Sequence, residues 1–206
     1  MLACAIEIKN GSIVMIKTLI IIAILVVSLI LMGGIIIFFF LSKIEKEPQI
    51  VTLQNSIELV GVSIKTDVKN IYKDASMLGK KYTDFKKLNK IPNLKEPWAF
   101  VAYSKDFNED TKSWEYIMGD VVTDLDSVPK GLNGYKIPSS TYAIFPIKAK
   151  FKFLWGLEIA RMKKYIFTNW LLNSKYESTG CDFEYHDERS TGKNPSIDLY
   201  VEIEKK

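Results

Sequence analysis

The sequence contains one uninterrupted apolar run, TLIIIAILVVSLILMGGIIIFFFLS, which extends from Thr18 to Ser42 and carries no charge over its 25 positions. The hydrocarbon core of a bilayer is about 30 Å thick and needs about 20 helical residues to cross it. A cleaved signal peptide would have an apolar region of about 7 to 15 residues and a small-residue cleavage site, and the run has neither. The run could also be a buried core helix, but the rest of the chain is too small to surround a helix that is apolar on all sides. The run therefore predicts a transmembrane helix.

This helix divides the chain into a lead at residues 1–17, a span at 18–42, a linker at 43–49 and a folded region at 50–206. Two lysines flank the span on each side, so the positive-inside rule hardly separates the two orientations: Lys9 and Lys17 precede it, and Lys43 and Lys46 follow it. We expect a single-pass membrane protein, with the amino terminus in the cytoplasm and the folded region outside it.

Charge and motif content argue against several classes of function. The net charge is +4, and the basic residues are almost all lysines scattered along the chain, whereas a nucleic-acid-binding face concentrates charge and uses arginine. The single histidine, His186, has only Cys181 close by in the sequence, which is too few ligands for zinc. Walker, Gly-x-Gly-x-x-Gly and Gly-x-Ser-x-Gly motifs are absent. We predict no nucleic acid, metal or cofactor as a partner.

The folded region has the same order of predicted elements twice. Alternating Val and Ile residues predict a strand over Ile50–Lys65, and apolar residues three or four apart predict a helix over Asp67–Lys90. WAFVAY and WEYIMGDVV then form a predicted hairpin. The strand TYAIFPIKA, a helix over Leu154–Asn173 and a second hairpin of CDFEYHDE with SIDLYVEIE follow. The pattern predicts an α+β fold of tandem duplicated strand-helix-strand-strand modules, two antiparallel layers with one helix each and a central cleft at their join.

Six stretches in this order, YIMGDVV, VPKGL, YKIPSSTYAIF, NWLLNSKYE, DFEYHDE and IDLYVEIEK, resemble the GyrI-like small-molecule-binding domain, the effector-binding part of multidrug-responsive bacterial regulators. The resemblance covers about Ile50 to Lys205. It implies two modules related by a pseudo-two-fold axis, with a ligand cleft between them. A membrane span and a linker precede the domain where such regulators carry a DNA-binding module, so this chain is not expected to bind DNA.

The resemblance also suggests ligand-binding residues. Strand alternation places Asp182, Glu184 and His186 on one side of their strand and Cys181, Phe183 and Tyr185 on the other. In the family the Glu of the DFEYHDE stretch, here Glu184, lies in the cleft among aromatic rings, and Tyr142, Trp170 and Tyr116 match aromatic positions near it. A carboxylate among rings attracts a cation, and each ring face adds roughly 0.5 to 2 kcal/mol. The alternative is a solvated Glu184 on an edge strand.

Three functions are compatible with these residues. The first is a membrane-anchored domain that binds small amphipathic or cationic organic molecules, with Glu184 as the acidic anchor. The second is a hydrolase on the same scaffold that uses Glu184 as general acid or base and Tyr142 as its assistant, because desolvation can tune a carboxyl group for proton transfer. The third is a protein-interaction module of the inhibitor type.

Overall fold

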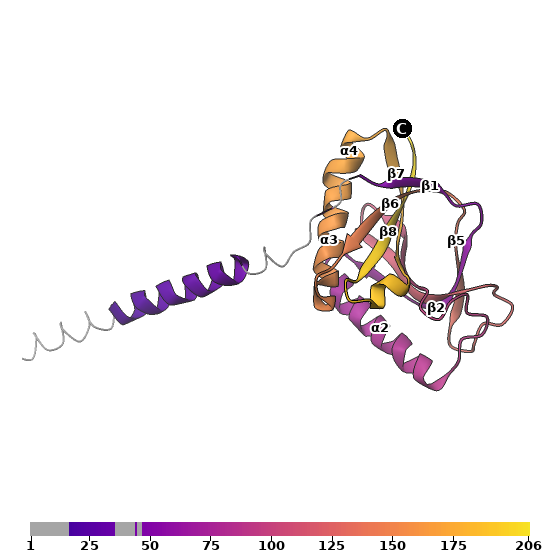
Figure 1. Ribbon diagram of the computed structural model, residues 1–206, viewed down its shortest axis with the longest axis horizontal. Helices are drawn as coiled ribbons and strands as arrows, with labels where there is room; N and C mark the ends of the chain where they lie inside the picture. Colours follow the sequence, from indigo (N-terminus) through magenta and orange to yellow (C-terminus); the bar gives the residue numbers. More distant parts are fainter. Residues whose placement is uncertain (1–16, 36–43, 45–46) are drawn as a thin grey trace, which may run out of the picture. The chain divides into compact units, whose positions relative to one another are not determined.

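The computed structural model of the protein describes residues 17–35, 44 and 47–206 (Figure 1). The first range is one helix of 19 residues, Lys17–Ile35, which is predominantly apolar and unburied. With a rise of 1.5 Å per residue it is about 29 Å long, which is enough to cross a membrane. A signal sequence near the amino terminus can also reach this length and apolar composition. The rest of the predicted span, residues 36–42, lies outside the described residues.

The folded region contains one antiparallel sheet of eight strands in the order β1-β6-β8-β7-β3-β4-β2-β5. Its elements are β1 (Gln49–Thr52), β2 (Ile57–Asp67), α2 (Ile71–Leu88), β3 (Phe100–Asn108), β4 (Ser113–Val122), β5 (Asn133–Ile137), β6 (Thr141–Lys148), α3 (Trp155–Tyr165), a π-helical turn (Ile166–Trp170), α4 (Leu171–Asn173), β7 (Tyr176–His186) and β8 (Ser196–Lys205), with short 3-10 turns at Lys152–Leu154 and Glu188–Thr191.

The predicted duplication is confirmed by the strand order. In the first module, β2-α2-β3-β4, the strands lie side by side as β3-β4-β2, and in the second, β6-α3-β7-β8, they lie as β7-β8-β6. The two sets are therefore mirrored in order about the central β3–β7 pair, as a pseudo-two-fold axis requires. Because β3 and β7 are hydrogen-bonded, the modules share one sheet, and the expectation of two separate layers is wrong.

The sheet is curled because its two ends are joined by a short connection. Strand β5 is the last in the sheet and β6 the second from the opposite edge, yet only residues 138–140 link them. Ile137 of β5 and Tyr142 of β6 consequently belong to one apolar cluster, which also contains the fully buried Leu59, Ile117 and Phe183. We call the face of the sheet that carries this cluster the inner face.

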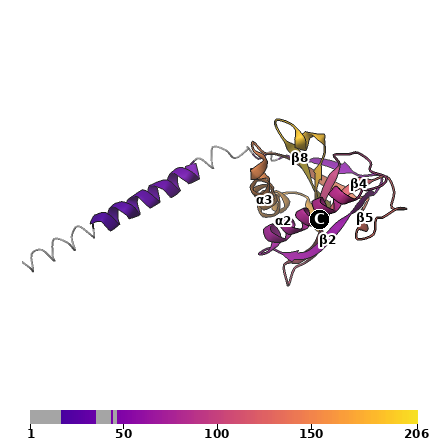
Figure 2. The same ribbon diagram turned by 90° about the horizontal axis from the view of Figure 1, so that it is seen from below.

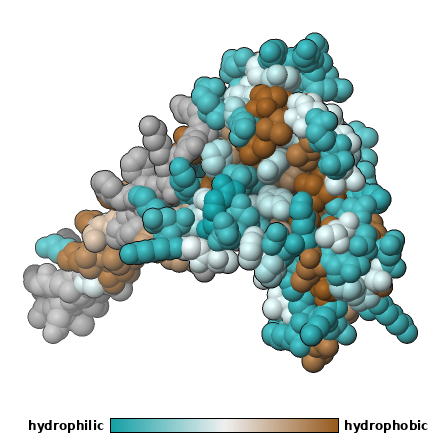
Figure 3. All heavy atoms as spheres, turned by 45° about the vertical axis from the view of Figure 1, so that its right-hand side comes forward, coloured by the Kyte–Doolittle hydropathy of each residue, from teal (hydrophilic) through white to brown (hydrophobic). Residues whose placement is uncertain are grey.

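Helices α2 and α3 lie side by side on the opposite face of the sheet, which we call the outer face (Figures 1 and 2). Leu78 and Tyr82 of α2 pack on the first module, and Met162 of α3 packs on the second. The two helices approach each other at their amino-terminal ends, where the ring of Tyr72 lies 3.6 Å from the position that a Cβ would occupy on Gly156. The exterior is largely hydrophilic on the side drawn in Figure 3, with hydrophobic patches between the polar residues.

Most predicted elements are confirmed, and the differences have local causes. The predicted strand over Ile50–Lys65 is two strands, β1 and β2, which pair with different partners at opposite edges of the sheet. Strand β5 was not predicted, because NGYKI has little apolar alternation. Gly61 lies in an unbroken register opposite Gly119, where a Cβ would meet the Met118 carbonyl oxygen at 2.0 Å. Glycine there permits close contact between two strands.

Candidate functional site

The candidate site lies on the outer face where the two modules meet. Strand alternation along β7 is confirmed: Phe183 contributes to the inner cluster, and the residues before and after it face the helices. The register of β3 against β7 sets Phe100 opposite His186, Ala102 opposite Glu184 and Ser104 opposite Asp182. We call these six residues the seam. Helix α2 flanks the seam on the side of β3, and α3 flanks it on the side of β7.

The seam contains two carboxylates, and α3 supplies one cation to them. The ammonium of Lys163 lies 2.6 Å from Oδ1 of Asp182 and donates a hydrogen bond to it. Nε2 of His186 lies 3.8 Å from Oε2 of Glu184. Glu184 is 8 % exposed, so its carboxylate is largely withdrawn from water. The two acids and the one lysine cation leave an excess of one negative charge among these three groups.

The electrostatics of the neighbouring groups reflect this excess. Burial raises the pKa of Asp182, and the charge of Lys163 offsets only part of that rise. For Lys163, burial alone would lower the pKa, but the charges of Asp182 and Glu184 outweigh burial and the pKa is raised. The pKa of Tyr116 is also raised, by burial first and then by the same two carboxylates. The site therefore favours positive charge.

Aromatic rings surround these charges. The ring of Phe100 lies 5.5 Å from the imidazole of His186, and the indole of Trp155 lies 6.3 Å from it, both edge to face. Tyr116 is buried on the outer face. It lies on β4, the strand next to β3, directly opposite Ser104 of the seam. Rings of this kind attract a cation through their faces and remove apolar surface of a ligand from water.

Of the four residues predicted to bind a ligand, two lie together. Glu184 and Tyr116 share the outer face, close enough for the carboxylate to influence the phenol. Tyr142 lies on the inner face, where it is buried and its hydroxyl donates to the Pro138 carbonyl over 2.9 Å. Trp170 packs on Phe145 in the cluster below α3, with ring centroids 5.2 Å apart. The structure therefore does not bring Tyr142 together with Glu184.

Sequence reasoning missed Lys163 as a member of the site. It lies four residues after Ile159 and three before Ile166, and both isoleucines belong to the buried side of the helix. A lysine within an apolar stripe of helical spacing was the available signal, because such a residue must reach a partner beneath the helix. Asp182 was placed correctly beside Glu184 by alternation, but no function was inferred for it.

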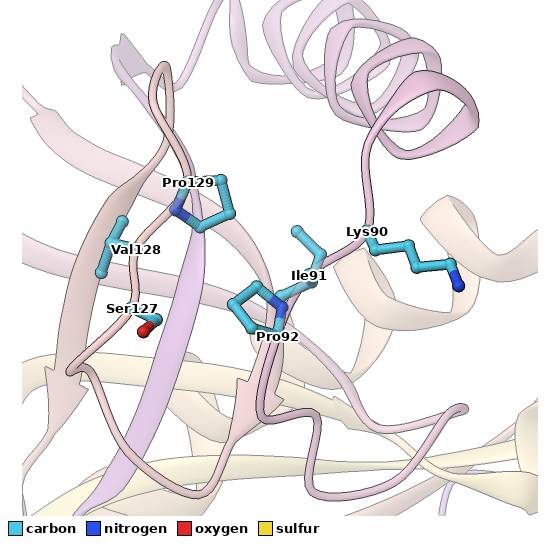
Figure 4. A pocket seen from close by; sticks show the side chains of 6 residues that line it. All are labelled: Lys90, Ile91, Pro92, Ser127, Val128 and Pro129. Atoms are coloured by element: carbon cyan, nitrogen blue, oxygen red, sulfur yellow. The ribbon is translucent and has the colours of Figure 1, made fainter.

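Two cavities among the described residues lie elsewhere, in the first module. One has a volume of about 540 Å³ and is lined by Lys90, Ile91, Pro92, Ser127, Val128 and Pro129 (Figure 4). The other, of about 330 Å³, is lined by Ser56, Ile57, Glu58, Lys95, Val121, Val122 and Thr123. Neither is lined by a residue of the seam. Ala102, Ser104 and Glu184 of the seam are buried, so a ligand would have to move neighbouring side chains to reach them.

A curled antiparallel sheet built from two strand-helix-strand-strand modules, with acidic residues at their join, defines a duplicated effector-binding domain. This chain belongs to the family of integron-associated effector-binding proteins called Cass2, which matches residues 49–203. The resemblance to GyrI-like domains inferred from the sequence is thereby confirmed.

Solved structures share the fold at low sequence identity. The integron cassette protein Cass2 from Vibrio cholerae aligns with a TM-score of 0.54 and 12 % identity, over 77 % of this chain and 97 % of that protein. A putative transcription regulation protein from Staphylococcus aureus MU50 aligns at 0.58 and 13 %, over 78 % and 99 %. SAV2435, solved with bound tetraphenylphosphonium, aligns at 0.59 and 13 %, over 77 % and 94 %.

A curated relative is a longer protein. The transcriptional regulator BrlR of Pseudomonas aeruginosa is 29 % identical over 107 residues, which are 50 % of this chain and 38 % of the regulator. This chain thus matches well under half of the relative's length. What is shared is the effector domain.

Proposed function

We propose that this domain binds small organic cations at the seam, with Glu184 as the acidic anchor and Phe100, Tyr116 and Trp155 as the surrounding rings. The observation that carries the proposal is that the seam holds two largely buried carboxylates but receives one lysine, which is bonded to Asp182. Among the ion pairs of the described residues, Glu184 has only the imidazole of His186, at 3.8 Å. A buried carboxylate without a matched cation is costly, and a ligand that brings its own positive charge removes that cost. A cation with a large apolar surface can pair with the carboxylate and pack against the rings at the same time.

The likeness to SAV2435 supports this class of ligand. That protein was solved with bound tetraphenylphosphonium, which is a permanent cation covered by aromatic rings. Tetraphenylphosphonium is therefore a suitable probe. Calorimetric titration of residues 48–206 with it should give saturable binding, and a probe concentration 100 times Kd should stabilise the fold by about 2.7 kcal/mol. Absence of binding to the folded domain would contradict the proposal.

Lys163 should compete with the ligand because its ammonium is bonded to Asp182 and is also attracted by the charge of Glu184. Replacing Lys163 with Met removes this internal cation, and we expect the affinity for tetraphenylphosphonium to rise about tenfold. The variant should also be less stable without ligand, since Asp182 loses its ion pair. Calorimetry on the Lys163→Met and Lys164→Met variants checks this, because Lys164 is exposed and should leave affinity unchanged. Equal or weaker binding by Lys163→Met would contradict the expected competition.

We further propose that the N-terminal helix Lys17–Ile35 anchors the domain in a membrane, with the domain on the outer side. Its length and apolar character support a span. A tether would suit a domain for lipophilic cations, because such ligands concentrate at bilayers.

Fractionation of cells that express the full chain checks the anchor. We expect the intact chain to remain with the membranes after alkaline carbonate washing, and added protease to remove the domain from intact cells. Residues 48–206 expressed alone serve as the control and should be soluble. Recovery of a mature chain that lacks the apolar run would identify a cleaved signal sequence and contradict the anchor.

A further inference from the structure

Large apolar side chains are exposed on α3 and on the short turns before and after it. Phe153 is 81 % exposed and Leu172 is 72 % exposed, although both would normally be buried. Three more apolar residues of the same region are at least two-fifths exposed, namely Phe151, Leu157 and Phe167. The rings of Phe151 and Phe153 stack on each other with centroids 5.5 Å apart. We call these five residues the α3 surface. A patch of this kind marks a contact site.

The segment that carries the α3 surface is strongly basic. Residues 148–175 contain six lysines and one arginine but only one acid, Glu158, so their net charge is +6 while that of the whole chain is +4. Lys148, Lys150, Lys164 and Lys175 are exposed there. Glu158 is buried beside Arg161, at 2.7 Å, and adds no negative charge to the exterior. Cations around an exposed aromatic patch favour an anionic, apolar partner.

The equivalent helix of the first module differs, although it also has exposed apolar residues. On α2, Lys80 and Lys87 both pair with Asp84, and Lys86 pairs with Asp120. Helix α2 has five lysines and two aspartates, so these ion pairs offset part of its positive charge. The two modules differ instead in their exposed phenylalanines: Phe151, Phe153 and Phe167 are exposed in the second module, whereas α2 exposes no phenylalanine.

The chain enters the folded domain on the α3 side. Ile44 packs against the apolar cluster beneath α3, together with Trp155, Ile159 and Tyr165. Nine residues lead from Ile35, the last described residue of the N-terminal helix, to Ile44, and a chain of this length spans at most about 32 Å when fully extended. A helix held in a membrane would thus keep Ile44, which packs beneath α3, within about 32 Å of the end of the described helix.

We propose that the α3 surface docks on an anionic lipid bilayer, with Phe153, Phe167 and Leu172 entering the acyl boundary and the surrounding lysines contacting phosphate head groups. Basic amphipathic helices with exposed aromatic residues bind in this way, and each lysine near an anionic surface contributes about 1 kcal/mol. The proposal rests on the proposed membrane anchor for the proximity of the lipid, but it does not depend on ligand binding at the seam. Because Lys163 projects from the inward side of α3, docking would hold the seam beside the bilayer.

The docking can be measured without the N-terminal helix. Residues 48–206 fold on their own by comparison with the Vibrio cholerae protein, 97 % of whose chain aligns with this domain. Sedimentation with vesicles should show binding to phosphatidylcholine mixed with phosphatidylglycerol and little binding to phosphatidylcholine alone. Phe153→Ser should lower the partition coefficient about tenfold, whereas Leu88→Ser, a change at an equally exposed apolar residue of α2, should leave it unchanged.

Equal binding to both kinds of vesicle would overturn the docking proposal, and so would equal effects of Phe153→Ser and Leu88→Ser. A concentration-dependent dimer that Phe153→Ser abolishes would also overturn it, because the α3 surface would then contact a second copy of the chain. Glu184→Gln separates this proposal from ligand binding, because that variant should bind vesicles as the unchanged domain does. Fractionation of the full chain tests the anchor independently of both.

Discussion

Replacing Glu184 with Gln is expected to lower the affinity of the domain for tetraphenylphosphonium by about 30-fold or more, which corresponds to about 2 kcal/mol. Glutamine has nearly the same shape but no charge. Lys163 then balances Asp182, and the seam loses its excess negative charge. The stability of the ligand-free domain should not fall, because the substitution removes a carboxylate that is only 8 % exposed and lies beside another acid.

Calorimetric titration measures this effect, and Glu177→Gln is the matched control. Glu177 lies on the same strand but is exposed near its start, so its neutralisation should change the affinity less than about twofold. Thermal unfolding of both variants without ligand shows whether the fold is kept. If folded Glu184→Gln domain bound the probe as well as the unchanged domain, the role of Glu184 as anchor would be refuted.

Glu184→Gln should lose affinity but keep its stability, and we expect the reverse for the neighbouring residue, Phe183. Replacing Phe183 with Ala should lower the free energy of unfolding by about 3–5 kcal/mol. The Phe183 ring is fully buried on the inner face. It stacks on Tyr200 with centroids 4.4 Å apart and meets Tyr142 edge to face at 5.3 Å. Removing the ring leaves a cavity among residues that the curled sheet holds in place. For a domain with a total stability of about 5–15 kcal/mol, this loss is severe.

Urea unfolding of residues 48–206 measures the loss, and Phe151→Ala is the control at a half-exposed phenylalanine, where a change within about 0.5 kcal/mol is expected. Under conditions in which the Phe183→Ala domain is still folded, its affinity for the cation should be close to that of the unchanged domain. A loss of less than about 1 kcal/mol would mean that the inner cluster does not hold the sheet together as described.

The sequence was sufficient to predict the arrangement of the modules and the two faces of β7. Repetition of strand, helix and hairpin gave the duplication, because each element carries its own periodicity. Strand alternation predicted that Glu184 and Phe183 lie on opposite faces of β7. The structure confirms this, because Phe183 is buried in the inner cluster and Glu184 is buried on the outer face. These features are local, since strand and helix periods depend only on neighbouring residues.

The placement of Tyr142 needed long-range information. Alternation in TYAIFPIK separates Tyr142 from Ala143 and Phe145 but does not say which set faces the helices. Phe145 packs below α3, so Tyr142 faces inward, and its burial there depends on the closure of the sheet through residues 138–140. The contact of Lys163 with Asp182 also joins residues 19 positions apart through tertiary packing. Local sequence patterns do not specify such contacts.

A crystal structure of residues 48–206 with tetraphenylphosphonium tests the central claim most directly. We predict the cation at the seam between β3 and β7, within about 6 Å of the Glu184 carboxylate and the ring of Tyr116 or Trp155, with the Lys163 ammonium displaced from its present position. A cation seated instead in the cavity lined by Pro92 and Pro129, with Lys163 still bonded to Asp182, would contradict the account.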